Sequence, residues 1–117
     1  LQREAKKSGL PWTLAKGFDT FGALSNIVPY TDWNSLRNET LSLKVNGETR
    51  QSAPLTDMIF KPGALISYLS TIFTLSAGDI IFTGTPEGVA PISQGDKLHA
   101  TLGKHVEAKF HVHNIPE

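Results

Sequence analysis

Alternating hydrophobic and polar residues predict two β-hairpins. Residues 41–45 alternate in this way, and Asn46-Gly47, a pair typical of tight hairpin turns, leads back through Thr49 and Gln51. Residues 97–102 and 105–113 repeat the pattern on either side of Gly103-Lys104. In the last run Val106, Ala108, Phe110 and Val112 face one way, while His105, Glu107, Lys109, His111 and His113 face the other. Two antiparallel hairpins are therefore expected.

A second pattern, with apolar residues at steps of three and four, predicts one substantial helix from Pro62 to about Phe73. Proline suits the first turn of a helix. The apolar positions are Leu65, Ile66, Leu69, Ile72 and Phe73. We expect this helix to pack on the sheet.

The N-terminal third has weaker patterns. Residues 1–8 contain good helix formers and precede Gly9, a residue suited to ending a helix. Residues 13–28 are short apolar pieces broken by glycine and aspartate, which predicts irregular strand and loop. Residues 30–38 predict a surface loop.

The segment 78–89 joins a short apolar run to a glycine-rich turn. Residues 80–82 have the composition of a strand, and Gly84 and Gly88 allow backbone conformations and close approaches that a side chain would block. Thr83 and Thr85, two residues apart, share a face of an extended chain and could meet one anion. The alternatives are the rim of a small-molecule site and an ordinary exit from a strand.

The composition narrows the fold class and the partners. The chain of 117 residues fits one small domain, and the mixture of hairpins and one helix predicts an α+β fold, a mixed β-sheet roll. Eleven basic and eleven acidic residues cancel, which disfavours nucleic acid as a partner. No apolar run is long enough for a membrane span, so we expect a soluble protein. With no cysteine, a disulfide scaffold and a thiolate nucleophile are excluded.

Lys16 is the candidate for chemistry that residue types alone suggest. It lies between Leu14-Ala15 and Gly17-Phe18, where a solvated lysine has little reason to be. A half-buried ammonium needs an anion, such as a substrate carboxylate or enolate. The plainer interpretation is a lysine that extends into solvent from a strand edge. His111 and His113 have the spacing of a metal-binding pair, but no third ligand lies near them in the sequence.

Several separated segments, in this order, resemble the fumarylacetoacetate hydrolase superfamily. They are LQR at 1–3, KSGLPWTLAK at 7–16, NGETRQ at 46–51, DMI at 57–59 and GDIIFTGTP at 78–86. The segment around 12–16 is most similar to the acylpyruvate hydrolase and oxaloacetate decarboxylase branch. The resemblance extends almost from end to end and implies that residues 1–117 form the C-terminal part of a single catalytic domain.

The resemblance also implies a site. Members bind magnesium, or manganese, through acidic ligands that would lie upstream of this chain. By position, Lys16 would be catalytic, beside the metal and a small 2-oxo acid, while Gln2, Gly84 and Thr85 would bind the substrate. The implied enzyme is a metal-dependent carbon–carbon hydrolase or decarboxylase of acylpyruvates or oxaloacetate, forming a homodimer in the cytoplasm, or in the mitochondrial matrix of a eukaryote. This chain alone is expected to be inactive.

Two other functions stay open. An isomerase or hydratase of dienoates from aromatic catabolism would keep the metal and differ in the residues that close over the site. A non-catalytic β-rich module is the alternative from another class, favoured if the 117 residues are the whole product. The codons before Leu1 would separate an enzyme of this family from the non-catalytic module, because such an enzyme needs its acidic ligands there.

Overall fold

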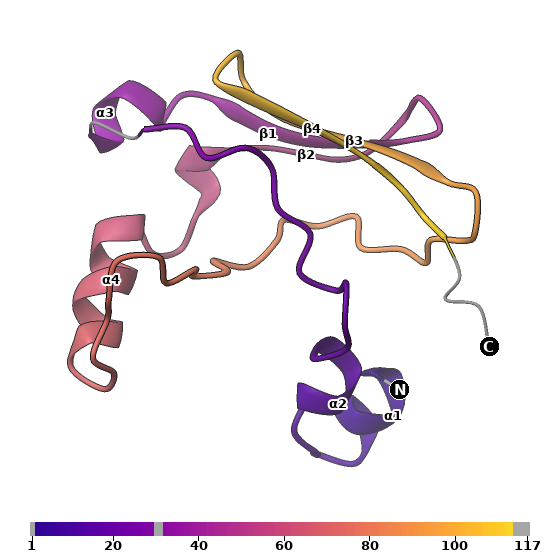
Figure 1. The fold of residues 1–117 in the computed structure, drawn as a ribbon, viewed down its shortest axis with the longest axis horizontal. Helices are drawn as coiled ribbons and strands as arrows, with labels where there is room; N and C mark the ends of the chain where they lie inside the picture. Colours follow the sequence, from indigo (N-terminus) through magenta and orange to yellow (C-terminus); the bar gives the residue numbers. More distant parts are fainter. Residues whose placement is uncertain (1, 30–31, 114–117) are drawn as a thin grey trace.

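A four-stranded antiparallel sheet forms the centre of the computed structural model, which describes residues 2–29 and 32–113. The strands are β1 (Thr40–Val45), β2 (Glu48–Pro54), β3 (Lys97–Leu102) and β4 (Val106–His111). Their order across the sheet is β2-β1-β3-β4, so the second hairpin pairs with the first through β1 and β3 (Figure 1).

Both predicted hairpins are confirmed. β1 and β2 pair from Val45 opposite Glu48, and the turn between them places Asn46 at φ 52° and Gly47 at φ 88°. Two successive positive φ values give the turn whose twist matches the twist of the strands, which explains the choice of Asn-Gly. β3 and β4 pair over their whole lengths.

The register divides the sheet into an apolar and a polar face. Three cross-strand rows of apolar residues lie on one face: Leu41–Leu102–Val106, Leu43–Ala100–Ala108 and Val45–Leu98–Phe110. The alternate positions carry Ser42–Thr101–Glu107 and Lys44–His99–Lys109. In β4 the predicted alternation is confirmed, since Val106, Ala108 and Phe110 are half-buried and the residues between them are exposed. Burial of apolar side chains therefore stabilises the sheet through one of its faces only.

The helices make few contacts with the strands of the sheet. They are α1 (Gln2–Lys7), α2 (Thr13–Lys16), α3 (Trp33–Leu36), the 3-10 turn η1 (Leu55–Asp57) and α4 (Pro62–Ser70). α1 and α2 lie together below the sheet in Figure 1, and α4 stands at the other end of the molecule. None of the helices in the described residues has the length and apolar character that a bilayer-spanning segment needs.

The α+β class and its main helix are confirmed, with one difference in packing. Helix α4 begins at Pro62 as predicted and ends at Ser70. Leu65 and Leu69 are half-buried, whereas Ile66 is 51% exposed and α4 makes no extensive contact with a strand. The helix at residues 1–8 is confirmed over Gln2–Lys7, and Leu1 lies outside the described residues.

Three local predictions were wrong. Residues 80–82 have strand-like side chains but pair with no strand in the described chain, because β structure needs a partner as well as propensity. α2 is a turn of helix where irregular strand and loop were expected. The predicted loop at 30–38 contains α3, started by Asp32, whose carboxylate accepts a hydrogen bond from the Ser35 amide at 3.0 Å. Tyr30 and Thr31 lie outside the described residues.

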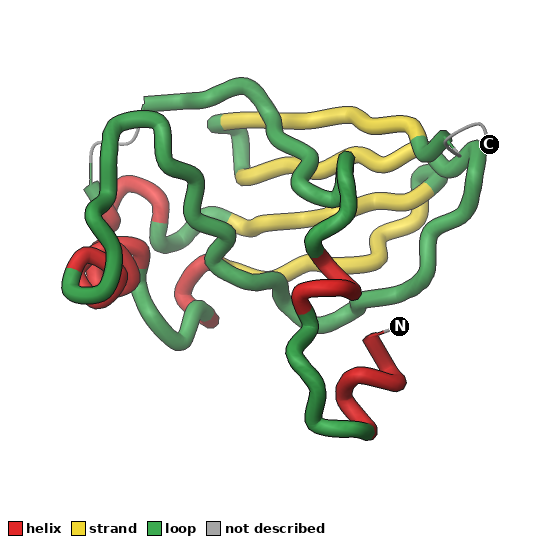
Figure 2. Tube along the Cα trace, turned by 60° about the horizontal axis from the view of Figure 1, so that its bottom comes forward, coloured by secondary structure: helices red, strands yellow, loops and turns green. Residues whose placement is uncertain are grey.

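Long loops cross in front of the sheet in the view of Figure 2. One is the segment after α2, which approaches the later loop where Gly22 lies against the Phe82 ring. The other is the segment 77–96, between α4 and β3. This second loop contains the glycine-rich turn and carries it to the edge strand β2.

Candidate functional site

The glycine-rich turn, residues 83–88, is attached to β2 by one side chain. The amide nitrogen of Gln51 donates to the hydroxyl oxygen of Thr85 at 2.9 Å, to the carbonyl of Pro86 at 2.8 Å and to that of Glu87 at 3.2 Å. Gln51 lies opposite Leu43 in the β1–β2 register, so its side chain projects from the apolar face of the sheet. The turn is thus held against an edge strand at three consecutive residues.

Gly88 brings the end of this turn into backbone contact with β2. Its φ is +95°, and a Cβ there would collide with the carbonyl oxygen of Arg50 and lie 3.2 Å from the Gln51 Cγ. Only glycine satisfies both the backbone angle and the close approach. The expected role of Gly88 in a close backbone approach is therefore confirmed, although the neighbour is protein and not a ligand.

Thr83, Gly84 and Thr85 line a cavity of about 380 Å³. Most of its other walls are apolar, from β1, β2 and the segment around η1, and Asp57 supplies a carboxylate. The polar groups available from the turn are two hydroxyls and backbone amides, and the cavity has no cation among its lining residues. A carboxylate ligand at this turn would be bound by neutral donors, with any positive charge coming from elsewhere.

The structure does not bring the four predicted site residues together. Gly84 and Thr85 lie in the turn, whereas Gln2 is in α1 and Lys16 ends α2. Lys16 is exposed, and its ammonium lies 5.1 Å from the centroid of the Trp12 ring, a cation–π distance. No hydrogen bond or ion pair in residues 2–29 and 32–113 joins Lys16 to the turn.

The local environment of Lys16 is open to solvent, and the residue ends a helical turn and does not lie at a strand edge. The ammonium is solvated and stabilised by an indole face, and the expected half-burial is not seen. Residues 12–16 supply both partners, because α2 is a single turn that places Trp12 and Lys16 four residues apart on one side.

A metal centre is not formed by this chain's described residues, in which no three histidine, aspartate or glutamate side chains converge. His111 and His113 stack, with ring centroids 6.3 Å apart, without a third ligand in that part of the chain. The donor set present does not fit a resident Mg²⁺ or Mn²⁺, both of which prefer several oxygen ligands.

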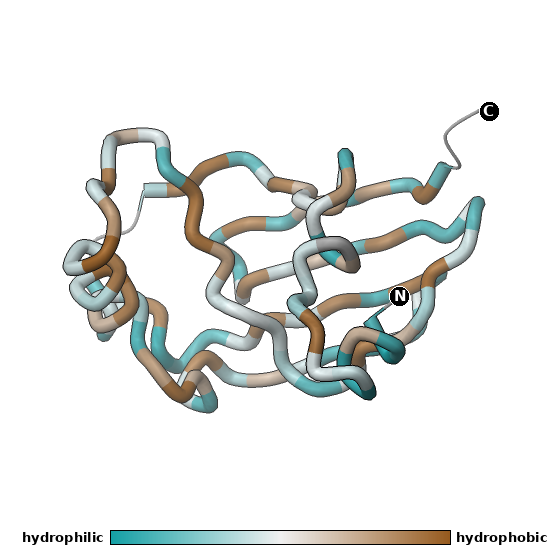
Figure 3. Tube along the Cα trace, turned by 90° about the horizontal axis from the view of Figure 1, so that it is seen from below, coloured by the Kyte–Doolittle hydropathy of each residue, from teal (hydrophilic) through white to brown (hydrophobic). Residues whose placement is uncertain are grey.

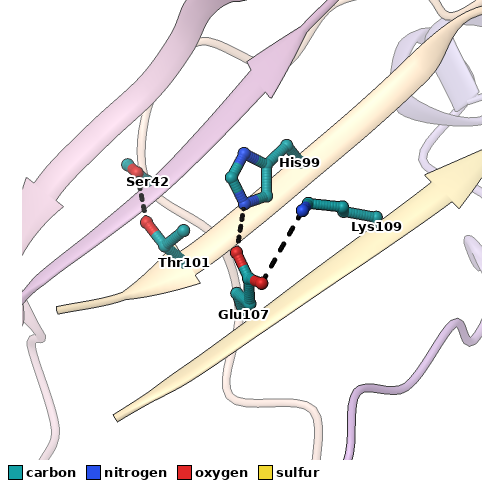
Figure 4. A network of polar contacts seen from close by, with 5 residues as sticks. All are labelled: Ser42, His99, Thr101, Glu107 and Lys109. Atoms are coloured by element: carbon teal, nitrogen blue, oxygen red, sulfur yellow. Dashed lines mark hydrogen bonds and ion pairs between the residues drawn. The ribbon is translucent and has the colours of Figure 1, made fainter. Parts of the chain in front are cut away.

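The charged residues of the polar face form a separate surface network (Figure 4). The Glu107 carboxylate contacts the His99 imidazole at 2.9 Å and the Lys109 ammonium at 3.7 Å. The hydrogen bond from His99, followed by the charge of Lys109, lowers the pKa of Glu107 below its usual value. Beside it, the hydroxyls of Ser42 and Thr101 are 2.8 Å apart. These groups are solvent-exposed or half-buried and lie on the opposite face from the cavity.

Gln51 is the residue that sequence reasoning missed. It was assigned to the returning strand of the first hairpin and to the NGETRQ segment of the family resemblance, but to no site, and its partners lie 34 to 36 residues further along the chain. A long polar side chain at position 51 lies opposite Leu43, on the apolar face, only because the β1–β2 register shifts between Leu43 and Lys44, and the alternating pattern does not predict that shift. Such a residue needs polar partners from another element.

Comparison with known proteins gives one consistent family. The model of the fumarylacetoacetate (FAA) hydrolase C-terminal domain matches residues 1–113. The mitochondrial oxaloacetate tautomerase FAHD1 of Arabidopsis thaliana is 52% identical over 112 residues, and the oxaloacetate tautomerase YcgM of Escherichia coli is 47% identical over 106. These alignments cover 96% and 90% of this chain but 50% and 48% of the relatives.

A solved structure gives the same result for the fold. Fumarylpyruvate hydrolase from Pseudomonas aeruginosa, in complex with Mn²⁺ and pyruvate, superimposes with a TM-score of 0.87 at 33% identity. The match covers 97% of this chain and 48% of that protein. The chain therefore spans about half the length of the relatives that it matches.

Proposed function

Because this chain belongs to the fumarylacetoacetate hydrolase family, we propose that the protein carrying it acts on small 2-oxo acids. Tautomerisation of oxaloacetate is the favoured reaction. The observation behind this choice is the high identity, 52% and 47%, to relatives that are named oxaloacetate tautomerases. Interconversion of keto and enol forms moves a proton between carbon and oxygen through an enolate, the same charged species that hydrolysis or decarboxylation of such acids produces.

A role in substrate binding is proposed for the 83–88 turn. The Thr85 hydroxyl and the Gly84 amide would donate to the substrate carboxylate, and the exposure of Thr85 together with its place at the cavity supports this. Lys16 is proposed as the catalytic cation that stabilises the enolate, with Gln2 as a further hydrogen-bonding group. For both, the support is their position in the family resemblance, since neither contacts the turn.

A divalent cation is proposed for the complete protein, with its ligands outside this chain. The support is the Mn²⁺ in the related fumarylpyruvate hydrolase. Assembly into a homodimer is proposed as well, consistent with the large exposed apolar surface of the chain. A mitochondrial location in a eukaryote would follow the naming of the Arabidopsis relative, and a cytoplasmic one is proposed otherwise.

Carbon–carbon bond hydrolysis is the second candidate, because the Pseudomonas structure is a fumarylpyruvate hydrolase. Decarboxylation of oxaloacetate is the third reaction that one enolate-stabilising site could support. These reactions share an enolate but differ in the bond that is broken to form it, so their products distinguish them.

The test uses the complete protein with oxaloacetate. Tautomerisation is followed by the loss of enol absorbance, decarboxylation by pyruvate formation, and hydrolysis by cleavage of an acylpyruvate. We expect Lys16→Met to lower kcat by about two orders of magnitude or more, as removal of a preorganised charge from an enolate site does. Lys104→Met, in the exposed turn after β3, is the matched control.

Thr85→Val is the second arm of this experiment. It should raise KM more than it lowers kcat, because a bond to a carboxylate is present in both ground and transition states. Thr74→Val, an exposed threonine after α4, is its control and should change neither constant. A protein with no activity in any of the three reactions contradicts the proposed function. Normal kinetics in both Lys16→Met and Thr85→Val contradicts the proposed site.

A further inference from the structure

We infer that Gln51 is a positioning residue, which fixes the Thr85 hydroxyl as a hydrogen-bond donor towards a carboxylate bound at the 83–88 turn. This inference rests on the proposed function. Its basis is the contact of 2.9 Å between the Gln51 amide nitrogen and the Thr85 hydroxyl oxygen. The residue would act on the substrate through Thr85 and not by touching it.

The direction of that hydrogen bond follows from chemistry. An amide NH₂ group only donates, so the threonine oxygen must accept from Gln51. A hydroxyl has one proton and can direct it to one partner, which cannot be the nitrogen that donates to it. The Thr85 proton is therefore directed to another acceptor, and Thr85 is exposed, so that a ligand can supply it. A substrate carboxylate is ionised at neutral pH and only accepts hydrogen bonds, so it is a suitable partner for the Thr85 proton.

The other two contacts of Gln51 also favour a negatively charged ligand at the turn. The carbonyl oxygens of Pro86 and Glu87 lie 2.8 and 3.2 Å from the same nitrogen, so its two protons serve three acceptors and one proton is shared. Carbonyl oxygens that face Gln51 do not face the ligand, where their partial negative charge would repel a carboxylate. The close approach of Gly88 to Arg50 fixes the end of the turn independently of Gln51. The neutral Gln51 side chain thus orients the Thr85 hydroxyl as a donor and turns the Pro86 and Glu87 carbonyls away from the ligand.

A purely structural clamp would show the same contacts, and a double-mutant cycle separates the two roles. In the complete protein we would combine Gln51→Glu with Thr85→Val and measure KM and kcat for oxaloacetate. A carboxylate at position 51 accepts the Thr85 proton and reverses the hydroxyl. We expect Gln51→Glu to raise KM about tenfold or more with a smaller change in kcat, as loss of a hydrogen bond to a charged group does.

The coupling between the two residues is the decisive result. In the Thr85→Val background Gln51→Glu should raise KM by a clearly smaller factor than in the wild type, because no hydroxyl remains to be oriented and only the contacts with the Pro86 and Glu87 carbonyls are lost. As the pH is lowered from about 8 to about 4, below the ordinary glutamate pKa of about 4.3, protonation of the introduced carboxylate restores a donor, so the KM of Gln51→Glu should move towards that of the wild type, while Thr85→Val shows no such recovery. Asn38→Asp, at an exposed position before β1, controls for the added charge.

The outcomes distinguish the two proposals. Independent, additive effects of Gln51→Glu and Thr85→Val on KM would overturn the role of Gln51 and leave the proposed function standing. Wild-type protein without activity on oxaloacetate or an acylpyruvate would overturn both. If thermal melting shows that Gln51→Glu does not fold, Gln51→Met removes the donor without adding charge, and the same cycle applies. A tenfold effect of Gln51→Met that persists with Thr85→Val would contradict the inference.

Discussion

At the scale of single residues, Gly88 carries two restrictions at once. Its φ of +95° disfavours any side chain, and a Cβ would collide with the Arg50 carbonyl oxygen on β2. The carbonyl belongs to the backbone of a strand and cannot rotate aside. The close approach of the 83–88 turn to β2 therefore requires glycine at position 88.

We predict that Gly88→Ala lowers the free energy of unfolding of the complete protein by about 2–3 kcal/mol, since overpacking adds to backbone strain. Gly78→Ala is the matched control. It has a similar φ of +99° but open space within 4 Å, so it should cost about 1 kcal/mol. Urea denaturation of both variants measures the difference. Equal losses would show that the close approach to Arg50 has no energetic consequence.

Asp96 gives a prediction about pH. Its carboxylate accepts from the Ser93 amide and the Asn46 side chain, both at 2.8 Å. The bond from Ser93, followed by that from Asn46, lowers the pKa of Asp96 below its ordinary 3.8. The folded state thus binds this proton less tightly than the unfolded state, so the stabilisation is complete above the unfolded pKa. It is lost as the pH falls through the lower folded pKa.

We therefore expect wild-type protein to be more stable than Asp96→Asn at about pH 6, and this advantage to decline between about pH 4 and pH 2. The free energy of unfolding in urea, measured across that range, gives the curve. Asp19→Asn is the control, because no hydrogen bond to Asp19 is present in the described structure. A constant difference between wild type and Asp96→Asn at all pH values would contradict the assignment.

At the scale of elements, local signals predicted the structure well wherever neighbours in sequence are also neighbours in space. Asn46-Gly47 fixes its own turn and the adjacent pairs of β1 and β2, up to the register shift between Leu43 and Lys44. Pro62 and the apolar repeat after it specify α4. In contrast, residues 80–82 carry strand propensity, but their environment is decided by loops packed from elsewhere, such as Gly22 against Phe82.

The candidate site shows the same limit. Gly84, Gly88 and Thr85 could be recognised from the glycine and threonine pattern of one segment. Gln51 could not, because its function depends on a contact with a turn 34 residues away. The single turns α2 and α3 are too short to produce a period, although Asp32 three residues before Ser35 was a usable capping signal.

Helix α4 gives a prediction at this scale. Gly63 follows Pro62 in the first turn, and a Cβ there meets nothing within 4 Å. Gly63→Ala should raise the free energy of unfolding by about 0.5–1 kcal/mol, because alanine loses less backbone entropy on entering a helix. Ser67→Gly in the same helix should have the opposite sign. Thermal melting of both variants tests this, and a destabilised Gly63→Ala would indicate that the first turn is not helical in solution.

At the scale of the whole molecule, the chain has very little enclosed interior. Among the described residues Val45, at 8% exposure, is the only buried hydrophobic side chain. Figure 3 shows hydrophobic positions spread along the loops as well as the strands. Large apolar side chains left in water mark surfaces that associate with other protein. A sheet with one apolar face and loops over it explains the arrangement, but it does not bury the loops themselves.

We therefore predict that the 117-residue chain, produced alone, is dimeric or aggregates, and that it binds a hydrophobic dye. Ile27 and Ile59, 94% and 90% exposed, offer a direct test. Replacing both by serine should reduce self-association, measured by light scattering across a range of concentrations. It should leave the melting temperature nearly unchanged, because the chain's own fold buries little of either side chain. Val45→Ser, by contrast, should lower the melting temperature. A monomeric chain at high concentration would contradict the prediction, since the exposed surface would then be stable in water without a partner.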